Sequence, residues 1–481
     1  MLALGAVFLF AELPMLPVVI WDESRLACNA MEMRQTGLSL ITTYDFRPDL
    51  WNTKPPLLIW LMDASMAIFG PSPWALRLPS AAAALATAAL VMGFSWRMTR
   101  SALVTVAAGL LLIASPGFFS KHVALTGDYD ALLYLLTTGY ALSAFFNISR
   151  VRPRPAAVLA TAALIAGAVL TKGVAGLVPG VGLLAYVVLT RRWMRLLTSP
   201  VYLLGGALAG VVAGGYYWLR EAASTGYLQA VWNNELVGRY VGTIKGHARQ
   251  YYYYLVMVFT TFGFSIGPAP LPLLAVYPKL TGKRRAAARL CLCMTAGLLV
   301  VLTLGQTKIR WYAAPIYPFL AVFCAITLEA WLKGLSEQPR GWLRLTRRRA
   351  EVATGVAAAI LVAVVIPYRY LYVPHTLDTP TTRYGALLAQ LRGEGARKVY
   401  VVDGGEANTE NMINYTPQLH YYALVFREHG LQVQEAISLS PASVRSSDVV
   451  ATCDGRWTAQ VSSLGRNGSR VRDCVAVRMR K

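Results

Sequence analysis

The sequence predicts an all-α polytopic membrane domain followed by a small C-terminal α/β domain. Of the 481 residues, 56% are hydrophobic and only 15% are charged, whereas a typical soluble domain has about 25% charged residues. The mean hydropathy is +0.45, and apolar runs near the thickness of a bilayer recur along most of the chain. Basic residues collect in every second connection between these runs, which is typical of a multi-pass membrane protein.

Eleven membrane spans are expected. The first run has the length of a signal peptide, but Glu12 interrupts it and it lacks a basic start and a small-residue cleavage site. We therefore expect it to be retained as the first span. The spans are expected at about residues 1–20, 74–96, 102–114, 131–146, 156–170, 174–189, 201–218, 251–274, 290–304, 313–331 and 352–366.

The connection between the first two spans, Asp22–Ser72, is long and mixes polar with apolar residues. Within it, Leu57–Phe69 is apolar but too short to cross a bilayer, and it carries Asp63. The segment is expected to lie along the membrane surface as an interfacial helix of the first outer loop.

The distribution of charge orients the chain. Five short loops hold 19 of the 46 Lys and Arg residues against two acids, Glu337 and Glu351. Basic loops stay in the cytoplasm, so the opposite loops and the tail are expected on the outer face. The net charge of +22 is then explained by topology, and no nucleic-acid partner is expected.

The tail changes in character, and we expect a domain boundary between a membrane domain, 1–373, and an extracytoplasmic domain, 374–481. Helices are predicted at 384–392 and 421–429, and strands at 398–402, 431–437 and 475–479. About 100 residues can bury a modest core. Cys453 and Cys474 lie in this tail and form a disulfide or remain free thiols. The other four cysteines lie in or near apolar segments, where buried thiols are expected.

Carboxylates and cations from six segments are expected on the outer face. A cation at a bilayer surface suits a phosphate, and a nearby acid can serve as a general base. The alternative is a set of ordinary juxtamembrane charges. The groups are Asp22/Glu23/Arg25, Lys54, Lys121/His122/Asp128/Asp130, Lys172, Glu235/Arg239/His247/Arg249 and Lys308/Arg310.

Six motifs run in order from about residue 20 to residue 320. They are Asp22-Glu23-Ser24-Arg25, Lys54-Pro55-Pro56, Arg77-Leu78-Pro79-Ser80, Thr126-Gly127-Asp128-Tyr129-Asp130, Thr171-Lys172-Gly173 and Glu235…Arg239-Tyr240…His247…Tyr252. This ordered set resembles the C-type (GT-C) integral-membrane glycosyltransferases. The similarity is to the branch of bacterial aminoarabinose transferases of lipid A and protein O-mannosyltransferases. The tail lies outside the resemblance.

The resemblance implies roles for individual residues. Asp22 would be the catalytic acid, as a general base or as the group that orients the acceptor, with Glu23 as a supporting acid. Asp128 would be a second acid lining the cavity, while Asp130 would be structural. Lys54 would hold the donor phosphate. The candidate helpers for that phosphate are Arg25, Arg239, His247, Lys308 and Arg310.

One position departs from the related lipid A-modifying enzymes, in which an acid that helps to bind a metal commonly precedes the lysine of the second motif. Here that position is Thr53. No metal site is therefore assigned at His247, and no cofactor is specified, although a divalent cation stays open. Aminoarabinose as the donor sugar is not supported either.

The expected function is transfer of a sugar from a polyprenyl-phosphate donor to a lipid, glycan or protein acceptor, with inversion as the usual outcome. The resemblance implies a bacterial inner-membrane enzyme with its active site on the periplasmic side, and membrane lipids as partners. A transporter would also have many spans but should show internal repeats and mid-span polar residues. A non-catalytic lipid-phosphate-binding protein would tolerate loss of Asp22. The sequence does not identify the sugar, the acceptor or the oligomeric state.

Overall fold

The computed structural model describes residues 22–118, 120–242, 248–262, 273–336, 383–405, 415–436 and 448–479, with a few positions before residue 22. Its internal contacts divide the chain into two compact units. Unit 1 comprises Met1–Phe10, Asp49–Leu58 and Pro79–Ile366, and unit 2 comprises Ala11–Pro48, Ile59–Leu78 and Pro367–Lys481. The expected domain boundary at 373/374 lies outside the described residues.

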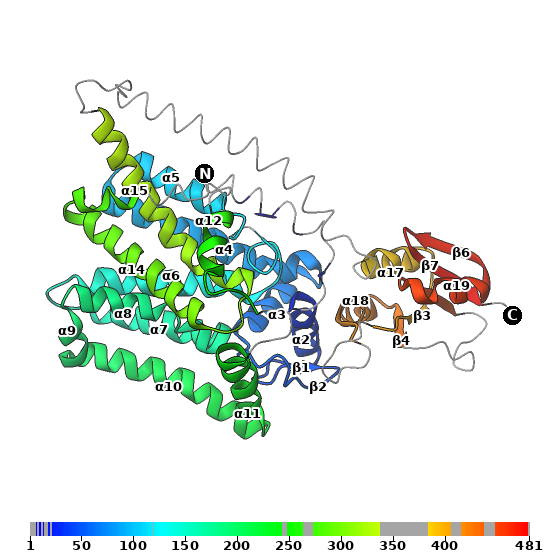
Figure 1. Cartoon of the computed structure of the whole chain (residues 1–481). Coiled ribbons are helices and arrows are strands. Elements are labelled where there is room, and N and C mark those ends of the chain that lie inside the picture. Colours follow the sequence, from blue (N-terminus) through cyan, green and yellow to red (C-terminus); the bar gives the residue numbers. More distant parts are fainter. Residues whose placement is uncertain are drawn as a thin grey trace. The chain divides into compact units, whose positions relative to one another are not determined.

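Unit 1 is helical (Figure 1), which confirms the predicted polytopic class. Six helical segments of the described chain are long and apolar enough to cross a membrane: Pro73–Thr99, Tyr129–Ile148, Pro155–Gly176, Pro200–Ala223, Gly282–Leu304 and Arg310–Gly334. The helices are α4 (Pro73–Thr99), α5 (Ala102–Ile113), α6 (Tyr129–Ile148), α7 (Pro155–Lys172), α8 (Gly180–Leu189), α9 (Trp193–Thr198), α10 (Pro200–Ala223), α11 (Tyr227–Val231), α12 (Tyr253–Thr261), α14 (Gly282–Leu304) and α15 (Tyr317–Ser336).

Three expected spans fall partly or wholly outside the described residues: 1–20, the second half of 251–274, and 352–366. The expected span 174–189 is divided, since a 3₁₀ turn, Gly173–Gly176, precedes α8 and Pro179 caps it. The basic residues 283–289, expected in a loop, lie on the first turns of α14. There Arg284 forms an ion pair with Glu329 of α15, so its charge is compensated and the helix begins earlier than its apolar run.

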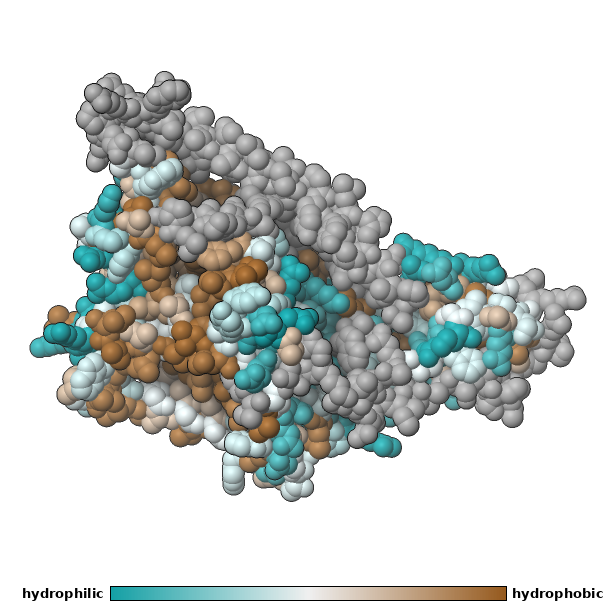
Figure 2. All heavy atoms as spheres, viewed as in Figure 1, coloured by the Kyte–Doolittle hydropathy of each residue, from teal (hydrophilic) through white to brown (hydrophobic). Residues whose placement is uncertain are grey.

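The helices pack closely where small residues meet. A Cβ added to Gly182 of α8 would lie 2.6 Å from Met294 of α14, and one added to Gly297 would lie 2.6 Å from Gly182. Such close approach is typical of membrane helices. By contrast, only 17% of the most apolar window of α10 is buried, and its Leu203, Val211 and Trp218 are exposed. Figure 2 shows hydrophobic side chains gathered over the helices of unit 1, as expected for a surface that faces lipid.

Unit 2 joins the first loop to the tail. The first loop supplies α2 (Asp22–Thr36), a hairpin of β1 (Thr43–Tyr44) and β2 (Arg47–Pro48), and α3 (Leu57–Phe69). The predicted helix 57–69 is confirmed in its bounds. The sequence did not predict α2, although Asp22 and Glu23 in its first turn and Arg34 in its last turn complement the helix dipole.

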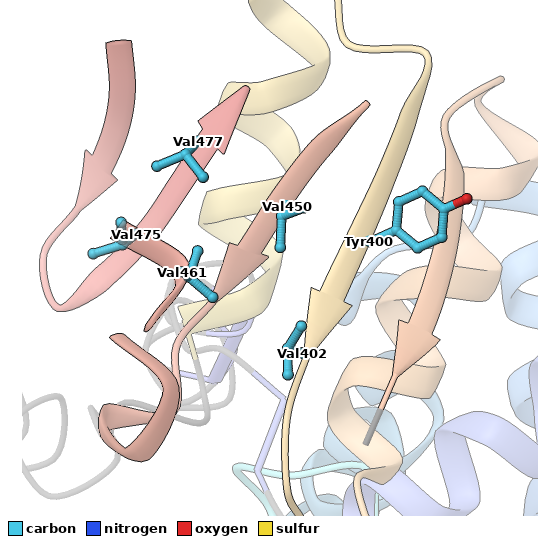
Figure 3. Packing of buried hydrophobic residues seen from close by; sticks show 6 residues of the cluster. All are labelled: Tyr400, Val402, Val450, Val461, Val475 and Val477. Atoms are coloured by element: carbon cyan, nitrogen blue, oxygen red, sulfur yellow. The ribbon is translucent and has the colours of Figure 1, made fainter. Parts of the chain in front are cut away.

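The tail contains a five-stranded sheet of order β4-β3-β5-β7-β6. The central strand β3 (Lys398–Val402) pairs in parallel with β4 (Gln432–Ala436) and β5 (Val449–Thr452), whereas β7 (Cys474–Met479) pairs antiparallel with β5 and β6 (Gly465–Val471). Helix α19 (Gly455–Ser463) contributes Val461 to the cluster on one sheet face, shown in Figure 3 with Val450 and Val477. This confirms the small α/β domain.

The three predicted tail strands, at 398–402, 431–437 and 475–479, correspond to β3, β4 and β7. The predicted helices correspond to α17 (Tyr384–Gly393) and α18 (Pro417–Glu428). The sequence missed β5, α19 and β6. Cys453 and Cys474 form a disulfide, which decides between the two alternatives, and the other four cysteines are buried free thiols as expected.

Helix α18 holds α2 through polar contacts within unit 2. His420 lies between two carboxylates, with Nε2 3.0 Å from Glu32 Oε1 and Nδ1 3.0 Å from Glu435 Oε1. Glu32 also accepts hydrogen bonds from the backbone N–H groups of Asp45 and Phe46 at the tip of the hairpin. One histidine thus connects α2, the hairpin and the tail sheet. Burial alone would lower the pKa of His420, but the hydrogen bonds and negative charges of Glu32 and Glu435 raise it to about 9.

Candidate active site

Asp128 is fixed where the loop after α5 meets α6. It is the N-cap of α6: one carboxylate oxygen accepts a hydrogen bond from the Tyr129 backbone N–H at 2.7 Å, and the other lies 2.8 Å from His122 Nδ1. The His122 ring stacks on Trp311, with centroids 3.8 Å apart. Burial alone would raise the pKa of Asp128, but the hydrogen bond and charge of His122, with Lys172 nearby, lower it. The site therefore favours an ionised Asp128.

Asp130 lies one residue into α6 and pairs with Lys172 at the end of α7. The Lys172 Nζ lies 2.6 Å and 2.7 Å from the two carboxylate oxygens, and both side chains are buried. The chain then breaks at Gly173, whose φ of +59° favours glycine. The two side chains form a buried ion pair that joins the start of α6 to the end of α7.

Lys54 is held less tightly than Lys172. Its Nζ lies 3.6 Å from Glu235 Oε1 and 5.6 Å from the centroid of the Tyr129 ring. Glu235 also accepts a hydrogen bond from the Thr53 hydroxyl at 3.2 Å, and the Thr53 carbonyl accepts one from the Tyr227 hydroxyl at 2.8 Å. The backbone of the neighbouring Thr53 is therefore held by a hydrogen bond, while the Lys54 ammonium group has a longer ion pair with Glu235 and lies near the Tyr129 ring.

A cavity of about 80 Å³ opens beside these ion pairs. Its polar lining comes from Asp130, Lys172, Glu235, Thr307 and Tyr312. The rest of the lining is apolar and comes from Leu133 of α6, the segment after α7, the end of α14 and the 3₁₀ segment Arg310–Ile316. The cavity therefore joins an apolar wall to one ammonium group, Lys172, and two carboxylates, Asp130 and Glu235, and Glu235 also faces Lys54.

The other candidate phosphate ligands of unit 1 differ in burial and in hydrogen bonding. Lys308 is buried and donates to the carbonyls of Thr303 and Gly305 at 3.0 Å and 2.5 Å, at the end of α14. Burial lowers the pKa of Lys308. Arg310 is exposed. Arg239 lies in the π-helical segment Trp232–Val241, and its side chain is outside the described part of the chain, as is the whole of His247.

Asp22, Glu23 and Arg25 belong to unit 2 and lie in the first turn of α2. Glu23 is buried and accepts two hydrogen bonds from Arg77 of α4, at 2.5 Å and 2.8 Å. This pair fixes the start of α2. Asp22, one residue earlier, is half-buried. The Arg25 guanidinium lies over the Tyr44 ring, 3.6 Å from its centroid, so in unit 2 it also has a packing role.

Sequence reasoning listed Glu235, His122 and Lys172 among the polar groups of the outer face but assigned none of them to the site. The signal for Lys172 was its position at a Lys-Gly turn directly after an apolar run. The partners of Glu235 come from residues 53 and 54, more than a hundred positions away, and no local pattern marks such a pair.

Residues 53–218 match the family profile of dolichyl-phosphate-mannose-protein mannosyltransferases. The chain is similar to the crystal structure of ArnT from Cupriavidus metallidurans bound to undecaprenyl phosphate, with 19% identity and a TM-score of 0.67 over 98% of this chain and 96% of that chain. The apo state of the same protein gives 18% identity and a TM-score of 0.66 over the same shares. An uncharacterized protein of Aquifex aeolicus (strain VF5) is 25% identical over 320 residues, which is 65% of this chain and 60% of that protein.

The resemblance seen in the sequence motifs is confirmed by these matches. The chain is a multi-pass membrane protein with the fold of the C-type membrane glycosyltransferases.

Proposed function

We propose that this protein, with its C-type glycosyltransferase fold, transfers a sugar from a polyprenyl-phosphate donor to an acceptor at the outer face of the membrane. The observation that carries the proposal is the cavity that joins an apolar wall to the cluster of Lys172, Asp130 and Glu235. Two comparisons support this donor class. The matching family profile is named for a dolichyl-phosphate-sugar donor, and the similar crystal structure contains undecaprenyl phosphate.

Lys54 is the proposed ligand of the donor phosphate, because its ammonium group is positioned but only loosely paired. Lys172 makes two short contacts with Asp130, so most of its charge is already compensated. Its proposed role is to hold the end of α7 beside the cavity. When the sugar leaves, the phosphate gains charge that a nearby cation stabilises.

Asp22 is the proposed base. It would accept the proton of an acceptor hydroxyl while the acceptor oxygen forms a bond to the anomeric carbon and the bond from that carbon to the phosphate oxygen breaks. The polyprenyl phosphate departs with the bonding electron pair. Glu23 would support this step by fixing α2 to Arg77, and the ionised Asp128 would stabilise positive charge that develops on the sugar.

The disulfide of the tail supports placement of the C-terminal domain outside the cytoplasm. Disulfides persist in oxidising compartments and are rare in the cytosol, and Cys453 and Cys474 form one here. Together with the basic loops expected in the cytoplasm, this supports the periplasmic side of a bacterial inner membrane for the tail and the active site.

The test is sugar transfer by the purified full-length chain from a panel of radiolabelled polyprenyl-phosphate sugars, with membrane lipid, glycan and protein fractions as acceptors. The proposal predicts labelled acceptor and an equal amount of released polyprenyl phosphate. Binding of polyprenyl phosphate without transfer from any donor would favour the non-catalytic lipid-binding alternative.

A further inference from the structure

A second cavity, of about 300 Å³, lies among α6, α7, α8 and α10 of unit 1. Apart from Thr161 and Tyr202, its lining consists of aliphatic side chains and glycine. Leu184 on its rim is exposed, as is most of α10. The cavity is therefore a groove that is open to the side where lipid is expected, and water would be a poor occupant of so apolar a space.

This groove is distinct from the candidate active site. It is lined by Val158 and Ala162 near the start of α7, whereas Lys172 lies at the other end of that helix. Fourteen residues separate Val158 from Lys172, which corresponds to about 21 Å along a helix. The groove shares no lining residue with the proposed donor cavity, although it extends along α8 to Gly180, which directly follows the cavity residue Pro179.

Two arginines are held at the mouth of the groove. Arg192 Nη1 donates to the carbonyl of Ile148 at 3.3 Å and to the Ser149 hydroxyl at 2.9 Å, and Ile148 lines the groove. Arg195 Nη1 donates to the Arg150 carbonyl at 3.0 Å, beside the lining residue Leu196. A guanidinium has five N–H donors, so these bonds orient both groups and leave donors for an anion.

The positive charge here has no local acidic counterpart in the sequence. The chain has no Asp or Glu between Asp130 and Glu221, yet this stretch has six arginines in the loops beside the groove. The positive-inside rule explains their sign. It does not explain why two of them are hydrogen-bonded at the entrance to a chain-sized apolar groove.

We propose that this groove binds an anionic phospholipid, with one acyl chain among α6, α7, α8 and α10 and the phosphate between Arg192 and Arg195. The apolar lining suits the chain, and the unbalanced arginines suit the headgroup. The lipid would fill a space that otherwise leaves the surrounding side chains without packing partners.

The test is native mass spectrometry of the full-length protein in a neutral detergent, titrated with phosphatidylglycerol or with phosphatidylcholine of the same acyl chains. One variant, Arg192→Gln with Arg195→Gln, removes the charge. A second, Gly206→Leu, fills the groove, since Gly206 lines it and a Cβ there meets nothing within 4 Å. Gly210→Leu on the same helix is the matched control, because Gly210 is equally open and does not line the groove.

Wild type should bind phosphatidylglycerol more tightly than phosphatidylcholine. The double arginine variant should lose phosphatidylglycerol affinity by roughly fivefold for each charge removed, with little change for phosphatidylcholine. Gly206→Leu should weaken both lipids, and Gly210→Leu should behave as wild type. Equal affinity of wild type for the two lipids, or wild-type phosphatidylglycerol affinity in both groove variants, would overturn the proposal.

Discussion

Lys54 and Lys172 both lie beside carboxylates, and the distances between the charged groups separate their roles. Lys172 Nζ approaches both oxygens of Asp130 within 2.7 Å, whereas Lys54 Nζ is 3.6 Å from Glu235. A phosphate can attract the loosely paired ammonium group without breaking a buried ion pair. Breaking a buried pair is expensive because it leaves an uncompensated charge.

Replacing Lys54 with Gln is therefore expected to weaken polyprenyl-phosphate binding by roughly tenfold to a hundredfold, the equivalent of one charge-assisted hydrogen bond. The fold should be retained, since Thr53 and Tyr227 hold the backbone. Lys279→Gln, at an exposed position outside the site, is the control. Binding of labelled polyprenyl phosphate to the purified variants measures the effect, and equal affinity in the two would contradict the role of Lys54.

His420 makes the stability of unit 2 depend on pH. The pKa of His420 is raised to about 9 in the folded protein. The ion pairs of His420 therefore contribute their full share to the free energy of unfolding below about pH 6.5, where the imidazole is charged in both the folded and the unfolded chain. This stabilisation is lost as the pH rises toward 9. A shift of this size corresponds to roughly 3 kcal/mol. The charged and titratable groups around the ring are Glu32 of α2, Glu435 of β4, Arg427 of α18 and Tyr44 of the hairpin.

Thermal unfolding of the purified protein measured between pH 6.5 and 9.5 should show a falling midpoint. The His420→Gln variant should start lower and lose less over this interval. Parallel pH profiles of wild type and variant would contradict the role of His420.

At the scale of single elements, the sequence predicted those helices and strands that have a local pattern of residues and missed those that depend on distant contacts. Helix α3 was predicted with its bounds because its apolar run and the flanking prolines and glycine, Pro55, Pro56 and Gly70, are local signals. Helix α2 was missed because its buried faces carry Glu23, Arg25 and Glu32, which no apolar period reveals. Their partners are Arg77, Tyr44 and His420, and these contacts exist only in the folded chain.

In the candidate site, too, the sequence indicated single residues within local motifs but not their contacts with distant segments. The motifs placed Asp128 and Lys54 at ends of apolar segments, and the structure gives both defined polar partners. The pairing of Glu235 with Lys54, and the stacking of His122 on Trp311, could not be derived, because each joins segments that are distant in sequence. Strand β5 was missed for another reason: a run of four residues is too short for a reliable period.

The break at the end of α7 is a second test at this scale. Gly173 has a φ of +59°, and an added Cβ would lie 2.7 Å from the Tyr217 hydroxyl. Gly173→Ala should therefore lower the free energy of unfolding by about 1–3 kcal/mol and displace Lys172. Gly214→Ala, on an open face of α10, is the control and should be neutral or slightly stabilising. Unfolding midpoints of the two variants measure the difference; an equal effect would contradict the requirement for a positive φ at residue 173.

For the whole molecule, the alternation of basic and neutral loops predicted a polytopic fold, and the described helices bear it out. It did not predict that the first outer loop and the tail form one compact unit. That grouping depends on α2 packing against α18 through contacts such as the hydrogen bond from Cys28 Sγ to the Pro417 carbonyl. No local pattern in either segment predicts this contact.

Orientation of the whole chain can be tested with introduced exposed cysteines, because Cys453 and Cys474 are buried. In intact cells, a membrane-impermeant maleimide should label a cysteine introduced by Gln460→Cys at an exposed position of α19. A cysteine introduced by Arg152→Cys in an expected cytoplasmic loop should react only after lysis. Labelling of the Gln460→Cys variant only after lysis would contradict the proposed periplasmic location of unit 2.

The most direct measurement of the central claim is sugar transfer by wild type and Asp22→Asn, prepared alike and assayed with the same radiolabelled polyprenyl-phosphate sugar. The account predicts that the variant binds polyprenyl phosphate as wild type does but loses roughly a hundredfold or more of the transfer rate, as expected for a general base. Transfer that proceeds at the wild-type rate in Asp22→Asn would contradict the assignment of Asp22 as the base.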